Sequence, residues 1–119
     1  MSRSAPQVDA FGGGGFRLSG EWRQGSVLIL DDVARDWATA SVADLSADSL
    51  SAVLQAGQGV CELLVLGMGG ANALPPREVR EAFLRAGVGL EYLDTPAAAR
   101  LYNLLTSEGR RVAAALIAI

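Results

Sequence analysis

Short apolar runs alternate with amphipathic segments through the second half of the chain. The runs Cys61–Leu66, Val88–Leu93 and Val112–Ile119 are predicted strands. Between them lie segments with apolar residues three and four apart, one after Pro75-Pro76 and one after Asp94-Thr95-Pro96. This order of strand, helix, strand, helix and strand predicts βαβ units with parallel pairing, and the almost uniformly apolar last run indicates a strand buried on both faces.

Both amphipathic segments carry helix start and stop signals. Proline costs no hydrogen bond at the start of a helix, and Asp94-Thr95 offers side-chain acceptors for the first N–H groups. Gly87 and Gly109 follow the two predicted helices. The positions expected to face the core are Val79, Phe83 and Leu84 in the first helix, and Leu101, Leu104 and Leu105 in the second, with Tyr102 at the edge of the stripe.

The first third of the chain has shorter alternating stretches separated by glycine. Val8–Phe11, Phe16–Leu18, a segment around Trp22, and Val27–Leu30 are predicted strands, and Gly12–Gly15 marks a tight reversal. Because such close spacing leaves room only for hairpin connections, these strands are expected to form an antiparallel β-meander.

The stretch between the two halves has a weaker pattern. Asp31–Trp37 mixes charged and apolar residues and is expected to be a turn. A short helix is expected through Leu50, Val53 and Leu54, with its cap in Ser46–Asp48.

The predicted fold class is therefore α/β. We expect one compact domain with a mixed central sheet, in which an N-terminal antiparallel β-meander is followed by βαβαβ. The polar residues 1–7 are expected to form a disordered tail and residues 8–119 the single domain, since 119 residues leave little room for a second core.

Composition excludes several classes of function. The net charge is −3 and the arginines are scattered, so nucleic-acid binding is not predicted. The chain has no histidine and one cysteine, which argues against imidazole-based catalysis and against a metal site, and no cofactor is predicted. No apolar run is long enough to cross a bilayer and no secretory signal is visible, so we expect no membrane insertion and a cytoplasmic location.

The glycine cluster Gly67-Met68-Gly69-Gly70 allows two interpretations. It lacks the third glycine of the dinucleotide-binding motif, and no Gly-Lys-Ser/Thr follows it. Nucleotide binding is therefore less favoured than a strand end that needs positive φ and close packing. If a site exists, it should lie at this point, because sites of open α/β sheets form at the carboxyl ends of strands.

A candidate small-molecule or anion site follows from this reasoning. Its residues are Gly67, Gly69, Gly70, Asn72, Asp94, Thr95, Asn103 and Arg110. Each also has a structural interpretation. The Asp94-Thr95 pair could cap the helix, Asn103 could satisfy the backbone of a neighbouring loop or point to water, and Arg110 could belong to a solvated turn. No catalytic residue is predicted.

Several motifs together resemble the Mth938-like family (DUF498). They are Gly15-Phe16-Arg17, Gly25-Ser26-Val27-Leu28, Leu64-Val65-Leu66-Gly67-x-Gly69, Gly87-Val88-Gly89-Leu90-Glu91-x-Leu93-Asp94-Thr95-Pro96, Tyr102-Asn103-x-Leu105 and Glu108–Leu116. The resemblance extends from about Val8 to Ile119. It implies a compact α/β domain with a mixed sheet and no established activity. Relatives include a mitochondrial respiratory complex I assembly factor.

The leading hypothesis is a non-enzymatic interaction or assembly module for a respiratory or other membrane complex. It needs a protein partner, which the sequence does not identify, and we expect a monomer or a weak homodimer. The alternative is the small-molecule or anion-binding domain described above, with weak enzymatic activity as a variant. Trp22 and Trp37 fit either a core or an interface, and Cys61 is expected to be an inert core thiol.

Overall fold

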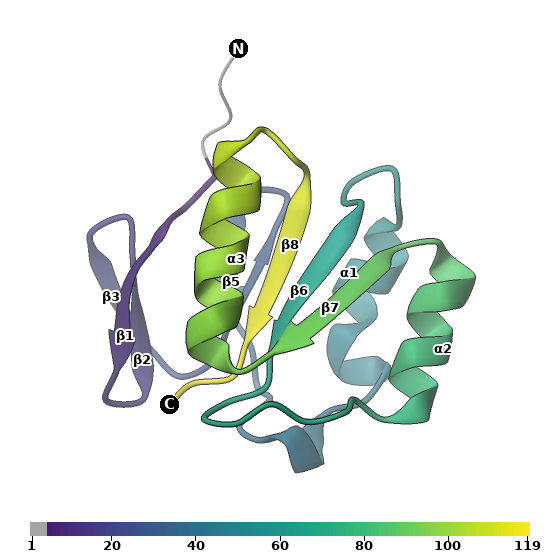
Figure 1. The fold of residues 1–119 in the computed structure, drawn as a ribbon, viewed down its shortest axis with the longest axis horizontal. Helices are drawn as coiled ribbons and strands as arrows, with labels where there is room; N and C mark the ends of the chain where they lie inside the picture. Colours follow the sequence, from purple (N-terminus) through teal and green to yellow (C-terminus); the bar gives the residue numbers. More distant parts are fainter. Residues whose placement is uncertain (1–4) are drawn as a thin grey trace.

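The computed structural model describes residues 5–119, which form two β-sheets and three α-helices (Figure 1). The first sheet is an antiparallel meander in the order β1-β2-β3. Its strands are β1 (Val8–Gly12), β2 (Gly15–Leu18) and β3 (Glu21–Gln24). The reversal predicted at the glycine run is confirmed, because Gly12, Gly13 and Gly14 all have positive φ.

The second sheet has five strands in the order β5-β4-β8-β6-β7. The strands are β4 (Val27–Leu30), β5 (Val33–Asp36), β6 (Leu63–Gly67), β7 (Gly89–Leu93) and β8 (Val112–Leu116). β4 is antiparallel to β5 and β8, whereas β6 is parallel to β7 and β8. The sheet is therefore mixed, and β8 lies at its centre.

Helices cover both faces of this sheet (Figure 1). α3 (Thr95–Ser107) packs on β6 and β8 and also contacts β1 of the small sheet. α1 (Ser51–Ala56) and α2 (Arg77–Ala86) cover the other face, together with the short 3-10 turns Val42–Asp44 and Asp48–Leu50. The predicted α/β class, a meander followed by βαβαβ, is confirmed. The meander ends at β3, however, so placing Val27–Leu30 in it was wrong: these residues form β4 of the five-stranded sheet and pair with β5 and β8.

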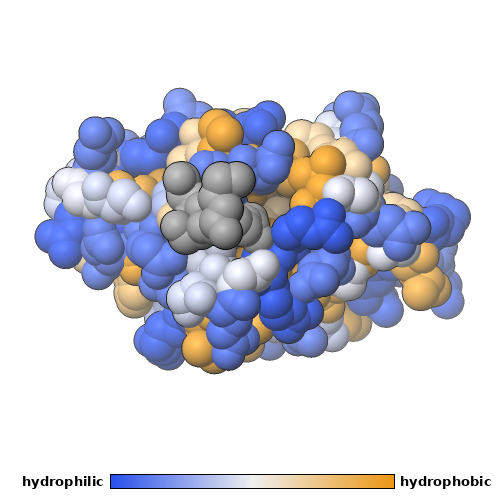
Figure 2. Space-filling model, turned by 90° about the horizontal axis from the view of Figure 1, so that it is seen from above, coloured by the Kyte–Doolittle hydropathy of each residue, from blue (hydrophilic) through white to orange (hydrophobic). Residues whose placement is uncertain are grey.

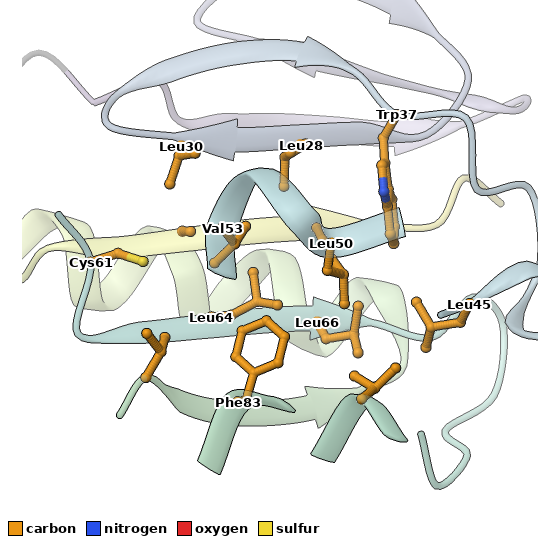
Figure 3. Packing of buried hydrophobic residues seen from close by; sticks show 14 of the residues in the cluster. Leu28, Leu30, Trp37, Leu45, Leu50, Val53, Cys61, Leu64, Leu66 and Phe83 are labelled. Carbon is orange, nitrogen blue, oxygen red and sulfur yellow. The ribbon is translucent and has the colours of Figure 1, made fainter. Parts of the chain in front are cut away.

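Alternation along the strands divides the core into two layers. In β6, Leu64 and Leu66 join the layer under α1 and α2, whereas Val65 joins the layer under α3. Figure 3 shows Phe83 of α2 lying against Leu64 and Leu66. On the α3 side, alanines of the helix lie in the same cluster as Ala114 of β8, and such small side chains let a helix approach a strand closely.

Residues 33–36 are not the turn that we expected. They form β5, an edge strand paired with β4, so this prediction was wrong. Asp31 and Asp32 make the connection with φ of 51° and 65°. A two-residue hairpin loop requires this left-handed backbone, which aspartate tolerates better than most residues. The charged side chains that suggested a turn belong to a solvent-exposed edge.

Two leucines predicted to face the core are exposed instead. Leu84 is 82% exposed and Leu104 is 55% exposed, whereas their neighbours Phe83 and Leu105 are buried. Adjacent residues on a helix point about 100° apart, and here Phe83 and Leu105 take the positions that face the sheet. Tyr102, expected at the edge of the stripe, is 1% exposed and lies in the middle of the core.

The two tryptophans have different environments. Trp37 is buried and its indole N–H donates to the carbonyl of Ser49, whereas Trp22 is exposed.

Residues 1–4 of the expected tail lie outside the described residues. Pro6 and Gln7, which we assigned to that tail, are hydrogen-bonded through their carbonyls, Pro6 to the hydroxyl of Tyr102. Within the described part, no helix is long and apolar enough to cross a bilayer.

Neighbouring residues of α2 provide a test of this packing. Phe83→Ala should lower the free energy of unfolding by about 3–5 kcal/mol, because it leaves a cavity beside Leu64 and Leu66. The matched control Leu84→Ala should change it by less than about 0.5 kcal/mol, since Leu84 is in solvent. Urea unfolding curves measure both values, and equal losses would contradict the described orientation of α2.

Candidate functional site

The hydroxyl of Thr95 joins the carboxyl ends of two strands to the start of α3. Its oxygen accepts a hydrogen bond from the N–H of Gly69 at 2.9 Å and donates one to the carbonyl of Ile117 at 2.7 Å. The backbone N–H of Thr95 also donates to the carbonyl of Gly69 at 2.8 Å. Thr95 is fully buried, so these bonds are shielded from water and hold β6, β8 and α3 together.

The glycines before α2 are shaped by this contact. A side-chain carbon on Gly67 would lie 2.9 Å from the hydroxyl oxygen of Thr95 and 3.0 Å from Leu116, closer than packing allows. Gly69 has a φ of +96°, which favours glycine. The structural interpretation, close packing and positive φ at a strand end, is thus borne out for these two positions. The N–H groups of Met68 and Gly69 donate to Leu93 and Thr95, so these two groups are not free to hold a phosphate.

Asp94 caps α3. Its carboxylate oxygen Oδ1 accepts a hydrogen bond from the N–H of Ala97 at 2.9 Å, and Pro96 occupies the first turn. The cap was predicted for Asp94 or Thr95, and the structure gives it to Asp94 while Thr95 faces inward. A helix leaves its first N–H groups without internal partners, so Asp94 satisfies one of them.

The outer part of the loop stays at the surface. Gly70 and Asn72 are exposed, and the side-chain oxygen of Asn72 accepts a hydrogen bond from the N–H of Ala73. The structure therefore brings the predicted loop residues together with Asp94 and Thr95 at one end of the sheet, as parallel pairing requires.

Two predicted site residues lie elsewhere. Asn103 is roughly two turns along α3 from Thr95, where its amide bonds both the N–H and the carbonyl of Val8 in β1. Arg110 lies before β8, at the amino ends of β6 and β8, and its Nε donates to Glu62 at 2.6 Å. The length of β8 separates Arg110 from the loop, so placing it near the candidate cleft was wrong.

The end of the molecule near the start of β8 presents a mixed surface (Figure 2). Hydrophilic residues dominate there and hydrophobic ones are scattered among them.

Burial raises the pKa of the Cys61 thiol, although the nearby Arg111 opposes this shift, so the thiol stays protonated at neutral pH. Across residues 5–119, no three cysteine or carboxylate side chains gather as a metal-binding group would.

Two hollows in the surface lie away from the predicted cleft. One of about 410 Å³ lies beside β3 and β5 and is lined by Glu21, Arg23 and Val33 among others. The other, of about 280 Å³, lies between α2 and β7 and is lined by Leu84, Leu90 and others. Sequence reasoning missed both. For the second hollow, the available signal was the adjacent apolar pair Phe83-Leu84, of which Phe83 faces the core and Leu84 faces solvent.

Comparison with known proteins extends these observations. The family described as "Protein of unknown function (DUF498/DUF598)" matches residues 8–117. An uncharacterized protein of Rhodobacter capsulatus is 39% identical over 110 residues, covering 92% of this chain and 82% of that protein. NADH dehydrogenase (ubiquinone) 1 alpha subcomplex assembly factor 3 of Danio rerio is 36% identical over 103 residues, covering 87% of this chain. The chain spans 59% of that assembly factor's length.

Solved structures show the same architecture. A protein of Rhodopseudomonas palustris is 37% identical with a TM-score of 0.82, covering 98% of this chain and 84% of that one. A Mth938-like domain of Bordetella pertussis is 26% identical with a TM-score of 0.81, covering 98% and 88%. A protein described as an outer membrane protein of Bartonella henselae is 29% identical with a TM-score of 0.89, covering 96% and 95%.

The two buried threonines of α3 form a matched pair for testing the Thr95 contact. Thr95→Val should lower the free energy of unfolding by about 2–4 kcal/mol, because it leaves the Gly69 N–H and the Ile117 carbonyl buried without partners. Thr106→Val should be neutral or slightly stabilising, since the buried Thr106 hydroxyl oxygen has no hydrogen-bond partner within residues 5–119. Chemical unfolding measures both, and equal effects would show that the Thr95 bonds contribute no net stability.

The cap on α3 gives a smaller and separate effect. Asp94→Ala should cost about 1 kcal/mol of stability, because the N–H of Ala97 loses its acceptor. Asp94→Asn keeps an acceptor and should stay close to the parent protein. Thermal unfolding compares the three proteins. An alanine variant that melts like the parent would show that Asp94 does not stabilise the helix.

Proposed function

We propose that this chain, which belongs to the DUF498 family and has the Mth938-like fold, is a non-enzymatic protein-interaction module that helps a larger complex to assemble. The similarity to an NADH dehydrogenase assembly factor supports this role, because it covers most of the chain. We further propose that the complex is respiratory or otherwise membrane-bound, that the chain works from the cytoplasm, and that it needs no cofactor.

The proposal rests on one contrast: buried polar groups at the strand ends bond one another, whereas large apolar side chains are exposed on the surface. At the strand ends, where a small-molecule site was expected, the buried groups of Gly69 and Thr95 bond one another and Ile117. On the surface, large apolar side chains face solvent, with Trp22 57% exposed and Leu84 82% exposed. Aromatic side chains such as tryptophan are typical anchors of protein interfaces.

The small-molecule alternative has weaker support from the same geometry. A phosphate or carboxylate bound at a glycine loop is held by free backbone N–H groups. The N–H of Gly69 already donates to Thr95, and that of Met68 already donates to the carbonyl of Leu93. An anion that approached the N–H groups of Met68 and Gly69 would therefore have to displace buried bonds that stabilise the fold.

Deletion of the gene in the native host tests the proposed role. Cells without the chain should contain less fully assembled NADH dehydrogenase on native gels of the membrane fraction, and the wild-type chain should restore it. Crosslinking followed by affinity capture of the tagged chain should recover subunits of the same complex, with the tag alone as control. Normal assembly in the deletion strain, together with no reproducible partner, would contradict the proposal.

A further inference from the structure

We propose that the open edge of β7 binds an extended segment of a partner protein as an added strand, and that this segment alternates apolar with basic residues. The inference rests on the proposed function, because it assigns the surface through which an interaction module would act. β7 ends the five-stranded sheet, with β6 as its neighbour on one side. Addition of a strand to such an edge is a recurring way in which proteins bind extended peptides.

The hydrogen bonds to β6 show which groups of β7 are free. The N–H of Gly89 donates to the carbonyl of Glu62, and the carbonyl of Leu93 accepts from the N–H of Met68. In a parallel ladder alternate residues direct both backbone groups to the same neighbour, so Gly89, Glu91 and Leu93 face β6. The N–H and carbonyl groups of Leu90 and Tyr92 therefore point outward, where no described strand pairs with them.

An apolar hollow lies beside these outward groups. It has a volume of about 280 Å³ and is lined by residues of α2 and β7. The apolar side chains of Phe83, Leu84, Leu90 and Tyr92 line it, together with the charged Arg80. Leu84 is 82% exposed although it lies on a helix that packs against the core. A bound strand would direct every second side chain into this hollow, which favours apolar residues at those positions.

The other strand edges of the described residues are protected. The side-chain amide of Asn103 bonds both backbone groups of Val8 and so covers part of the β1 edge. β3 and β5 carry charged side chains, and Arg23 and Asp36 form an ion pair of 3.0 Å between them. Charged side chains are a common means of preventing pairing at strand edges. β7 has only one charge, at Glu91, and this difference favours β7 as the docking edge.

Glu91 favours a basic partner over a second copy of this chain. In an antiparallel pair of two β7 strands, the register that uses Leu90 and Tyr92 of both copies puts Glu91 opposite Glu91. Like charges directly opposite each other are destabilising, and both copies also carry a net charge of −3. A lysine or arginine of another protein in that position would instead be attracted. Glu91 is exposed on the face opposite the hollow, so basic and apolar residues must alternate.

Selection from a phage-displayed library of random nonapeptides tests the inference on the whole protein. Peptides enriched on the wild-type chain should alternate apolar and polar residues and carry lysine or arginine at one polar position. Selection on Glu91→Lys should enrich aspartate or glutamate there instead. Binding of a selected synthetic peptide should shift the amide NMR signals of Leu90 and Tyr92.

Matched variants separate this edge from other surfaces. Leu84→Ser should weaken the selected peptide about tenfold, because one exposed leucine no longer contributes apolar contact. Leu104→Ser, an exposed leucine on α3, and Glu21→Lys, an equal charge reversal on β3, should leave binding unchanged. No enrichment, or enriched peptides that bind Glu91→Lys and Leu84→Ser like wild type, would overturn the inference. So would a dimer that Glu91→Gln tightens, since a second copy would then occupy the edge.

The outcome is distinguishable from failure of the proposed function. If Glu91→Lys and Leu84→Ser still restore assembly and still capture the same subunits, the chain is an assembly module that uses another surface. If peptides bind β7 as described but deletion leaves assembly normal, the edge is a docking site and the assembly role is wrong.

Discussion

A single buried hydroxyl sets the geometry of the end of the sheet where α/β proteins usually bind ligands. Thr95 bonds the backbone after β6 and the backbone after β8 while it begins α3. The close approach of Thr95 explains why residue 67 is glycine, because a side chain there would collide with the hydroxyl. Without this contact the turn after β6, the start of α3 and the end of the central strand would each lose a buried partner.

The hydrogen bonds around Thr95 affect function because they occupy inner N–H groups of the turn after β6, to which a ligand could otherwise bind. A glycine-rich turn at a strand end can bind anions only while its N–H groups are free, and here Thr95 and Leu93 accept those of Gly69 and Met68. The outward N–H and carbonyl groups of Leu90 and Tyr92, beside the exposed Leu84, have no strand paired with them among the described residues. This contrast between the bonded inner turn and the open strand edge is the basis of our proposal that the edge binds another chain.

Local patterns in the sequence predicted most of the fold, and the failures share one cause. Proline with a capping aspartate located α3, and the apolar runs located β6, β7 and β8, because those signals depend on near neighbours. The sequence did not separate Phe83 from Leu84, place Arg110 beside Glu62, or show that residues 33–36 pair with β4. These features depend on which element packs beside which. The partner of Thr95 could not be predicted either, because its two bonds reach residues 26 and 22 positions away along the chain.

Hydrogen exchange of single backbone amides in the free protein tests the central claim, that the ligand end is closed and the β7 edge is open. The account predicts slow exchange for Gly69, Glu91 and Leu93, whose N–H groups are bonded within the fold, and fast exchange for Leu90 and Tyr92 between them. Protection of Leu90 and Tyr92 in the free monomer, or fast exchange at Gly69, would contradict it.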